Sequence, residues 1–453
     1  MKIQFLGAVD GVTGSRHRVE IGDDRVLLDC GLFQGFKVQR ERNWAPLPQE
    51  LLDVDAVVLS HAHLDHSGYL PALVKQGYRG AIYASPATCD LAAVLLMDAA
   101  HLQEEDARRA NRYGYSRHAK ALPLYTRADA TRAIARLRPL PMGREQRVGG
   151  IGITLTPAGH LLGACSVTLS RGGGERLVFS GDLGRSADLL MPPPQPVTRA
   201  DALVVESTYG NRVHPPEDPA ERLGQVIRDT VERGGSVLLP SFAVGRAQAL
   251  LLLLQRLRRT GAIPKALPIF VDSPMALEAT ALYRRHAALL RVNPREMKML
   301  TEGVTLVATV QQSMRLSRSR WPSVIISASG MATGGRVLHH LKSLLPDARH
   351  HVCFPGFQVG GSRGARLVAG ATEVKIHGEY VPVRAEVSHL ESLSGHADSD
   401  ELMAWMRQFR SPPQQTFVVH GEPDAADALR ARIGHELGWR VRVPQLGEVA
   451  EIG

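Results

Sequence analysis

Three histidines and an aspartate lie within six residues, directly after a predicted apolar strand. The strand covers residues 55–60, and the polar residues are His61, His63, Asp65 and His66. Imidazole nitrogen and carboxylate oxygen are ligands that zinc accepts readily. Ligands this close together can serve two adjacent ions, the first two histidines on one and the aspartate and last histidine on the other. The alternative, a surface loop that happens to be rich in histidine, leaves the ligands elsewhere in the chain unexplained.

Four further candidate ligands share one placement, because each follows a short apolar segment that predicts a strand. They are Asp29, His160, Asp182 and His420. A sheet fixes the ends of its strands, so residues that follow several strands can converge on one edge of the fold. A lone histidine after a strand is usually structural. An ordered series of such residues is a much stronger indication of a metal site.

One resemblance covers these residues nearly from end to end of the chain. The chain resembles the metal-binding series of the metallo-β-lactamase superfamily. The matching residues are His61-x-His63-x-Asp65-His66, followed by His160 and Asp182. The three extra motifs of its β-CASP branch resemble those around Glu206, His396 and His420. That branch includes the endonuclease subunit of the eukaryotic cleavage and polyadenylation factor, and bacterial and archaeal ribonucleases.

The resemblance implies an α/β fold, a metallo-β-lactamase αββα sandwich with an inserted α/β β-CASP domain. The expected boundaries are 1–208 and 395–453 for the sandwich and 209–394 for the insertion. The residues are compatible with this, because from about residue 209 helix-like stretches alternate with short apolar runs. Such alternation predicts a mainly parallel sheet covered on both faces. The runs cover 236–239, 268–271, 324–326 and 351–354.

Carried over by position, the resemblance implies two zinc ions per chain. His61, His63 and His160 would hold one ion, and Asp65, His66 and His420 the other. Asp182 would bridge both ions, and Asp29 would orient a ligand from behind. A zinc pair can activate water for attack on a phosphodiester. His396 is the expected proton donor to the leaving oxygen, Glu206 would orient it, and Asp65 is also counted among the catalytic residues.

Small polar residues, glycines and arginines follow the apolar runs of the second half. Backbone amides at helix starts form ready anion sites, so these positions are candidates for binding substrate phosphates. Ordinary strand-to-helix turn chemistry is the alternative, and it explains any one of them alone. The candidates are Ser241, Arg246, Ser273, Ser329, Gly330, Thr333, Ser362 and Arg363.

The composition of the 453-residue chain suits a globular protein of two or three domains. No long apolar run predicts a membrane span and no signal peptide is visible, so a cytoplasmic protein is expected. The four cysteines are scattered and predict neither a disulfide framework nor a cysteine zinc site.

The net charge of +9 and the sequence pI near 9.6 favour a polyanionic partner, although many basic proteins bind no nucleic acid. Arginines cluster at 108, 109, 112 and 117, and again at 315, 318 and 320. A solvated face explains each cluster as well as contact with RNA does. Residues 104–125 are assigned no role.

Four functions remain open on the sequence. The favoured one is a zinc-dependent ribonuclease acting on single-stranded RNA in processing or decay, because histidine at position 420 is associated with RNA enzymes in the family. A DNA nuclease, or a hydrolase of lactones or thioesters with the same fold, is the alternative. A non-enzymatic RNA-binding scaffold is disfavoured by the intact ligand series. The family resemblance also leaves a homodimer open.

Overall fold

The computed structural model describes residues 1–114, 116, 118–172 and 174–452. Arg117 of the first arginine cluster lies outside the described residues. The chain divides into two compact units. Unit 1 comprises residues 1–187, 192–213 and 396–453, and unit 2 comprises residues 188–191 and 214–395.

Unit 1 contains two seven-stranded sheets. The first has the order β22 (Val449–Glu451), β1 (Lys2–Phe5), β2 (His17–Ile21), β3 (Asp24–Leu28), β4 (Ala56–Val58), β5 (Ala81–Ala84) and β6 (Leu137–Pro139). The second has the order β21 (Val441–Arg442), β20 (Gln415–Val419), β11 (Ala202–Glu206), β10 (Arg176–Phe179), β9 (Cys165–Ser170), β8 (Ile151–Pro157) and β7 (Gln146–Val148).

The two sheets of unit 1 pack face to face, and helices cover their outer faces. A buried cluster joins Phe5 and Val19 of the first sheet to Leu169, Val204 and Phe417 of the second. The helices are α1 (Lys37–Glu41), α2 (Leu64–Ser67), α3 (Leu70–Lys75), α4 (Pro86–Tyr113), α5 (Arg127–Ile134), α13 (Ser399–Met406) and α14 (Pro423–Leu437). A second cluster joins the first sheet to α3, α4 and α5, and α14 contacts β20 and β21. The αββα sandwich expected from the resemblance is confirmed.

Local sequence explains the elements that matter for the site. Strand β2 alternates buried and half-buried residues, as one face of a sheet requires, and pairs with β3 across the turn at Gly22, whose φ is +64°. Helix α4 begins after Ser85, whose side chain accepts from the amide of Thr88. It ends at Gly114, which has the left-handed conformation that commonly terminates helices.

Unit 2 contains a parallel sheet of six strands and a separate two-stranded hairpin. The sheet order is β14 (Val304–Leu306), β13 (Ile269–Asp272), β15 (Val324–Ser327), β12 (Val237–Pro240), β16 (His351–Phe354) and β19 (Glu386–His389). The hairpin is formed by β17 (Glu373–Ile376) and β18 (Glu379–Pro382). The parallel sheet predicted from the four apolar runs is confirmed.

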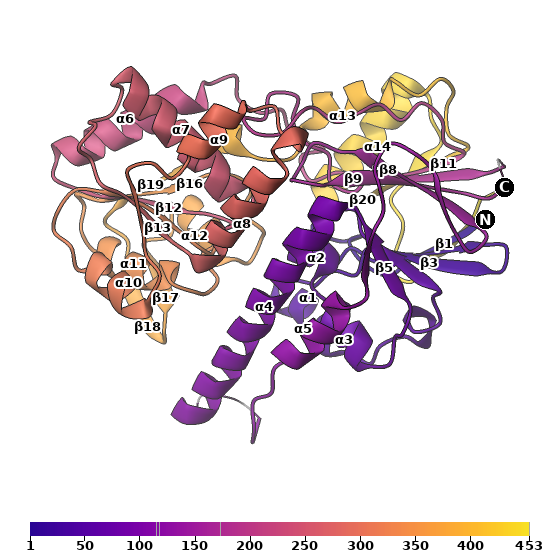
Figure 1. Cartoon of the computed structure of the whole chain (residues 1–453), viewed down its shortest axis with the longest axis horizontal. Helices are drawn as coiled ribbons and strands as arrows, with labels where there is room; N and C mark the ends of the chain where they lie inside the picture. Colours follow the sequence, from indigo (N-terminus) through magenta and orange to yellow (C-terminus); the bar gives the residue numbers. More distant parts are fainter. Residues whose placement is uncertain (115, 117, 173, 453) are drawn as a thin grey trace. The chain divides into compact units, whose positions relative to one another are not determined.

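The helices of unit 2 lie on both sides of its sheet. Figure 1 shows α6 and α7 on one side and α10 and α11 on the other. The leucine run 250–254 is entirely buried within α7. The helices are α6 (Pro219–Glu232), α7 (Arg246–Thr260), α8 (Pro274–Arg285), α9 (Pro294–Met299), α10 (Val310–Ser317), α11 (Val337–Leu344) and α12 (Arg363–Val368).

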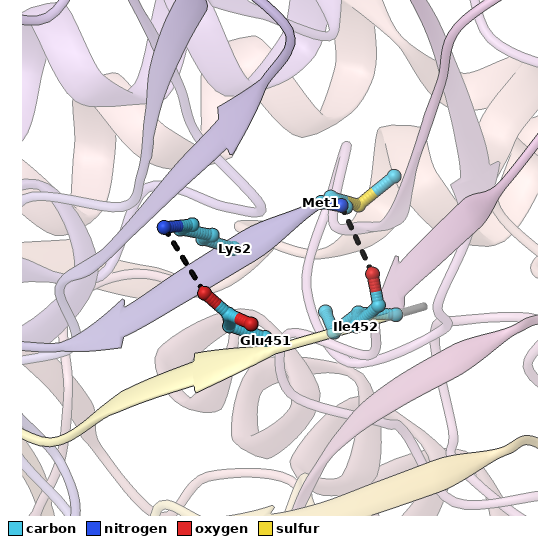
Figure 2. A pocket seen from close by; sticks show the side chains of 4 residues that line it. All are labelled: Met1, Lys2, Glu451 and Ile452. Atoms are coloured by element: carbon cyan, nitrogen blue, oxygen red, sulfur yellow. Dashed lines mark hydrogen bonds and ion pairs between the residues drawn. The ribbon is translucent and has the colours of Figure 1, made fainter.

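The two ends of the chain meet at the edge of the first sheet, where β1 pairs with β22. The amino group of Met1 donates to the carbonyl of Ile452 over 2.9 Å, and Lys2 pairs with Glu451 over 3.1 Å (Figure 2). These four residues line a surface hollow that contains none of the candidate site residues. Among the described residues, no helix has both the length and the apolar character that crossing a membrane requires.

Candidate metal centre

The candidate ligands of unit 1 come from the carboxyl ends of strands in both sheets. The loop after β4 carries His61 and His63 and continues into the short helix α2, which holds Asp65 and His66. Three more candidates follow strands of the second sheet, namely His160 after β8, Asp182 after β10 and His420 after β20. The structure brings all seven residues together.

The first group of ligand atoms gathers on one side of Asp182. His63 Nδ1 lies 3.1 Å from His61 Nε2 and 3.2 Å from His160 Nε2. The Oδ2 atom of Asp182 lies 3.5 Å from His61 Nε2 and 3.6 Å from His160 Nε2. These four side chains therefore present three nitrogens and one oxygen to a common point, which suits a single zinc ion.

The second group gathers on the other oxygen of Asp182. His66 Nε2 lies 3.0 Å from His420 Nε2 and 3.2 Å from Asp182 Oδ1. Asp65 Oδ2 lies 3.6 Å from His420 Nε2. Asp182 thus directs one carboxylate oxygen to each group, as a bridging ligand would.

The protonation of His66 tests whether a cation fits this arrangement. Its Nδ1 atom lies 2.7 Å from Asp29 Oδ2, and a carboxylate there places the ring proton on Nδ1. Nε2 of His66 faces Nε2 of His420 over 3.0 Å, and Nδ1 of His420 lies 3.2 Å from Thr208 Oγ1. Asp182 Oδ1 is also buried without a hydrogen-bond donor. Burial opposes the charged form of His66, but the carboxylates around it, led by Asp182, raise its pKa well above the ordinary value. These carboxylates therefore favour positive charge at this point, which a bound metal ion supplies.

Asp29 holds this arrangement from behind. It is fully buried, and its Oδ1 accepts from the backbone amide of Ser60 over 2.7 Å. Its Oδ2 accepts from the hydroxyls of Ser15 and Ser60 over 3.1 and 2.9 Å. Asp29 adopts a left-handed φ of +59° and His420 one of +53°. Backbone held in this sparsely populated region clusters at functional sites.

Burial and mutual charge set the protonation of the ligands. Burial lowers the pKa of His61 well below its ordinary value and that of His63 to about 4, so both imidazoles are neutral and able to bind a metal. Burial would raise the pKa of Asp182, but the surrounding histidines, led by His420, hold it well below the usual range. The Asp182 carboxylate is therefore ionised.

Glu206 and His396 lie beside the ligands. His396 Nδ1 lies 3.4 Å from Glu206 Oε2 and 3.9 Å from Asp182 Oδ2. The amide of Leu183 donates to Glu206 Oε1 over 2.6 Å. His396 is held by a β-bridge to Gly184. Burial opposes the charged form of His396, but the charge of Glu206 and a hydrogen bond to it outweigh that effect and raise the pKa of His396.

Comparison with known proteins agrees with this geometry. Family models match the metallo-β-lactamase superfamily over residues 17–223, the β-CASP domain over 247–367, and the Zn-dependent metallo-hydrolase RNA specificity domain over 380–444. Ribonuclease TTHA0252 of Thermus thermophilus is 38% identical to this chain over 99% of both proteins. The chain belongs to the β-CASP family of the metallo-β-lactamase superfamily. The resemblance read from the sequence is therefore confirmed.

Other relatives extend the comparison within the β-CASP family. The transcription termination factors FttA of Methanocaldococcus jannaschii and Pyrococcus abyssi are 32% and 34% identical to this chain. Their matches cover 95% and 98% of this chain, and 69% and 70% of their own lengths. A crystal structure of a protein of unknown function from Enterococcus faecalis superposes with a TM-score of 0.51 at 15% identity, covering 99% of both chains, and shows the fold alone.

The sequence did not indicate two residues that lie around the candidate metal centre. The hydroxyl of Ser60 lies 3.1 Å from His61 Nδ1, and that of Thr208 contacts Nδ1 of His420. Both orient a candidate ligand. Their only signal was position, because Ser60 directly precedes His61 and Thr208 follows Glu206 by two residues.

The candidate phosphate-binding residues all lie in unit 2, after strands of its parallel sheet or at the starts of its helices. Several of their side chains have local roles. Ser273 and Ser362 accept from the amides of Ala276 and Ala365 and so cap α8 and α12. Arg363 donates to the carbonyls of Lys375 and Ala332. Phosphate binding at these positions stays a prediction, and for these three side chains turn chemistry accounts for the contacts seen.

Proposed function

We propose that this chain is a two-zinc ribonuclease that hydrolyses phosphodiester bonds of single-stranded RNA. The observation that carries the proposal is the division of the ligand atoms into two groups, one on each carboxylate oxygen of Asp182. Zinc pairs of this kind stabilise the attacking and leaving oxygens of an in-line displacement. The relatives are named as a ribonuclease and as transcription termination factors, and these names support RNA as the substrate.

The residues of the chain have separable roles in this proposal. His61, His63 and His160 hold one zinc ion, Asp65, His66 and His420 hold the other, and Asp182 bridges them. Bound zinc supplies a water of lowered pKa and neutralises charge on the phosphate.

The proton for the leaving oxygen comes from His396. Its raised pKa keeps it protonated near neutral pH, and Glu206 orients the ring through Nδ1, so Nε2 is the atom that can donate to substrate. Glu206 is itself fixed by the amides of Leu183 and Thr208. His420 and the RNA specificity domain match over 380–444 favour RNA over DNA.

The test is digestion of end-labelled RNA and matched DNA, with zinc quantified in the same preparation. We expect the wild-type protein to hold two zinc ions and to cleave RNA faster than DNA. Asp182→Ala should lose zinc and activity together. His396→Ala should keep its zinc and lose about 100-fold or more in kcat, the usual contribution of general acid catalysis.

The matched control for His396→Ala is His435→Ala, because His435 is an exposed histidine at the end of α14. The control should behave as wild type. The proposal fails if the zinc-loaded protein cleaves no RNA but turns over a lactone or thioester panel. The proton-donor role fails if His396→Ala cleaves RNA at the parent rate.

A further inference from the structure

Helix α4 extends well beyond the body of unit 1. Its buried residues recur at helical spacing from Ala87 to Ala100, and after that Ala110 alone is buried. The helix therefore leaves the core after about residue 100, and Figure 1 shows its end extending past α3 and α5. We call residues 101–127 the basic arm; residues 115 and 117 within it lie outside the described part of the chain.

Described residues of the returning chain are hydrogen-bonded to helix α4. Asn111 donates to the carbonyl of Ala121 over 2.9 Å and accepts from its amide over 2.7 Å. Nearer the core, the side chain of Gln103 accepts from the amide of Leu124 over 3.1 Å. These contacts hold residues 121–124 against the outer part of helix α4.

Charge is segregated along the basic arm. Between residues 107 and 128 the sequence contains six lysines and arginines and no aspartate or glutamate. Arg109, Arg112 and Lys120 are exposed and form no ion pair among the described residues. Within the arm, Arg108 pairs with Glu105 over 2.6 Å and Arg127 with Glu104 over 3.1 Å, and Asp106 interacts electrostatically with Arg109. The positive charge that the arm presents beyond these pairs lies on Arg109, Arg112 and Lys120.

An aromatic ring lies among these cations. Tyr113 is 68% exposed at the end of α4, and the Arg112 guanidinium lies 5.6 Å from its ring centre. Proteins that bind single strands combine cations for the phosphates with exposed aromatic rings on which bases stack. A face that is merely solvated does not need an exposed tyrosine beside its arginines.

The opposite end of α4 is hydrogen-bonded to the loop after the candidate ligand His160. Ser85 and Thr88 donate to the carbonyl of Gly163 over 2.7 and 2.9 Å, in the loop that carries His160. At 1.5 Å per residue, the helix places its far end about 40 Å away. Stacked nucleotides advance about 3.4 Å each along one strand, so about 12 nucleotides would span this distance.

We propose that the basic arm is a second binding surface for single-stranded RNA, which engages substrates long enough to reach it from the metal centre. This inference rests on the proposed function for its substrate. Arg109, Arg112 and Lys120 contact phosphates, and Tyr113 stacks on a base. The arm raises the affinity for long RNA and takes no part in the chemical step.

The test compares two variants that each lose three exposed positive charges. The arm variant carries Arg109→Gln, Arg112→Gln and Lys120→Gln, because glutamine keeps helix propensity. The control carries Arg144→Gln, Arg147→Gln and Arg440→Gln, which are exposed elsewhere on unit 1. Binding is measured with zinc-loaded protein and cleavage-resistant phosphorothioate RNA of about 6 and about 30 nucleotides, lengths below and above the span.

We expect the arm variant to raise Kd for the long RNA about tenfold, with the short RNA changed less than about twofold. The slope of log Kd against log salt should fall by about 2, since each phosphate contact on a single strand contributes about 0.7. The control should bind both RNAs as wild type does. Tyr113→Ala should weaken binding of the long RNA, and Tyr113→Phe should restore it, because phenylalanine keeps the stacking ring.

Three results would overturn the proposal. They are wild-type affinity of the arm variant for long RNA, equal losses on both lengths, and an equal loss in the control. An acidic protein as the true partner of the arm would give the first result. Failure of the proposed function is distinguishable, since zinc-loaded wild-type protein would then cleave unmodified RNA of neither length, whatever the binding shows.

Discussion

Asp29 shows how a residue that holds no metal can decide how well metal is held. Its carboxylate fixes the ring of His66 through Nδ1 and is itself held by Ser15 and Ser60. The proton on Nδ1 leaves Nε2 free to bind the ion. Partners of this kind orient ligand rings and strengthen them as ligands.

Asp29→Asn is expected to weaken zinc binding about 10- to 100-fold, the usual effect of losing such a partner. Asparagine tolerates the left-handed φ of +59° at this position, so the loss would come from the missing charge rather than from backbone strain. Zinc affinity is measured by competition with a chelating indicator. Asp53→Asn, an exposed aspartate before β4, is the control. Unchanged affinity in Asp29→Asn would show that the carboxylate does not support the site.

At this scale the sequence predicted the ligands better than their supports. His61, Asp182 and His420 could be found because metal chemistry needs their residue types and a fixed order. Ser60 and Thr208 could not, because serine and threonine are common after strands and their hydroxyls gain a role only from the folded geometry. The individual roles of the ligands stay predictions.

Among the elements, strand β13 carries an ionic network that the sequence did not reveal. Asp272 at its end is fully buried. It accepts hydrogen bonds from Arg336 over 2.8 Å and His340 over 2.7 Å, and from the hydroxyl of Ser313. Burial would raise the pKa of Asp272, but these hydrogen bonds, led by that from His340, hold it below its ordinary value. The network joins β13 to α10 and α11.

Asp272→Asn should lower the stability of the protein by about 2 to 4 kcal/mol at neutral pH, because it leaves the largely buried Arg336 guanidinium without its charged partner. Since the folded pKa is depressed, the unfolded chain takes up the proton first as pH falls. The contribution of Asp272 is therefore present above about pH 4 and is lost as pH falls towards the folded pKa.

Urea unfolding of both proteins between neutral pH and about pH 3 measures this difference. The gap between wild type and variant should shrink on acidification. Glu278→Gln, an exposed carboxylate on α8, should leave stability unchanged at every pH. A constant gap would show that Asp272 does not titrate as the network requires.

The sequence predicted the types of these elements well and their neighbours poorly. The short buried strands of unit 2 follow from the four apolar runs at 236–239, 268–271, 324–326 and 351–354. The sheet order of unit 2, in which β15 lies between β12 and β13, does not. That order depends on crossovers that local patterns do not encode.

At the scale of the whole molecule, all seven candidate zinc ligands, from His61 to His420, lie in unit 1. Metal bound to the folded state alone stabilises it by about 4 kcal/mol when zinc exceeds its dissociation constant about 1,000-fold. Removal of zinc by a chelator should therefore destabilise unit 1 more than unit 2.

Hydrogen exchange measures this difference strand by strand. After chelation, peptides covering β4 and β20 should exchange faster, while those covering β12 and β16 should change little. In Asp182→Ala, already without zinc, the chelator should have no effect. Equal acceleration in both units would show that the metal does not stabilise unit 1 selectively.

Cytoplasmic location and a homodimer stay predictions.

The order of the ligands along the chain bears on how the protein is made. Asp182 leaves the ribosome more than 200 residues before His420, and nearly all of unit 2 lies between them. At about 5 to 20 residues per second, this interval lasts about 10 to 50 s. Throughout it the growing chain has most of its ligands and lacks the last one, so a prematurely ended product would remain an incomplete enzyme. Synthesis thereby withholds the complete candidate metal centre from every chain that has not been read as far as His420.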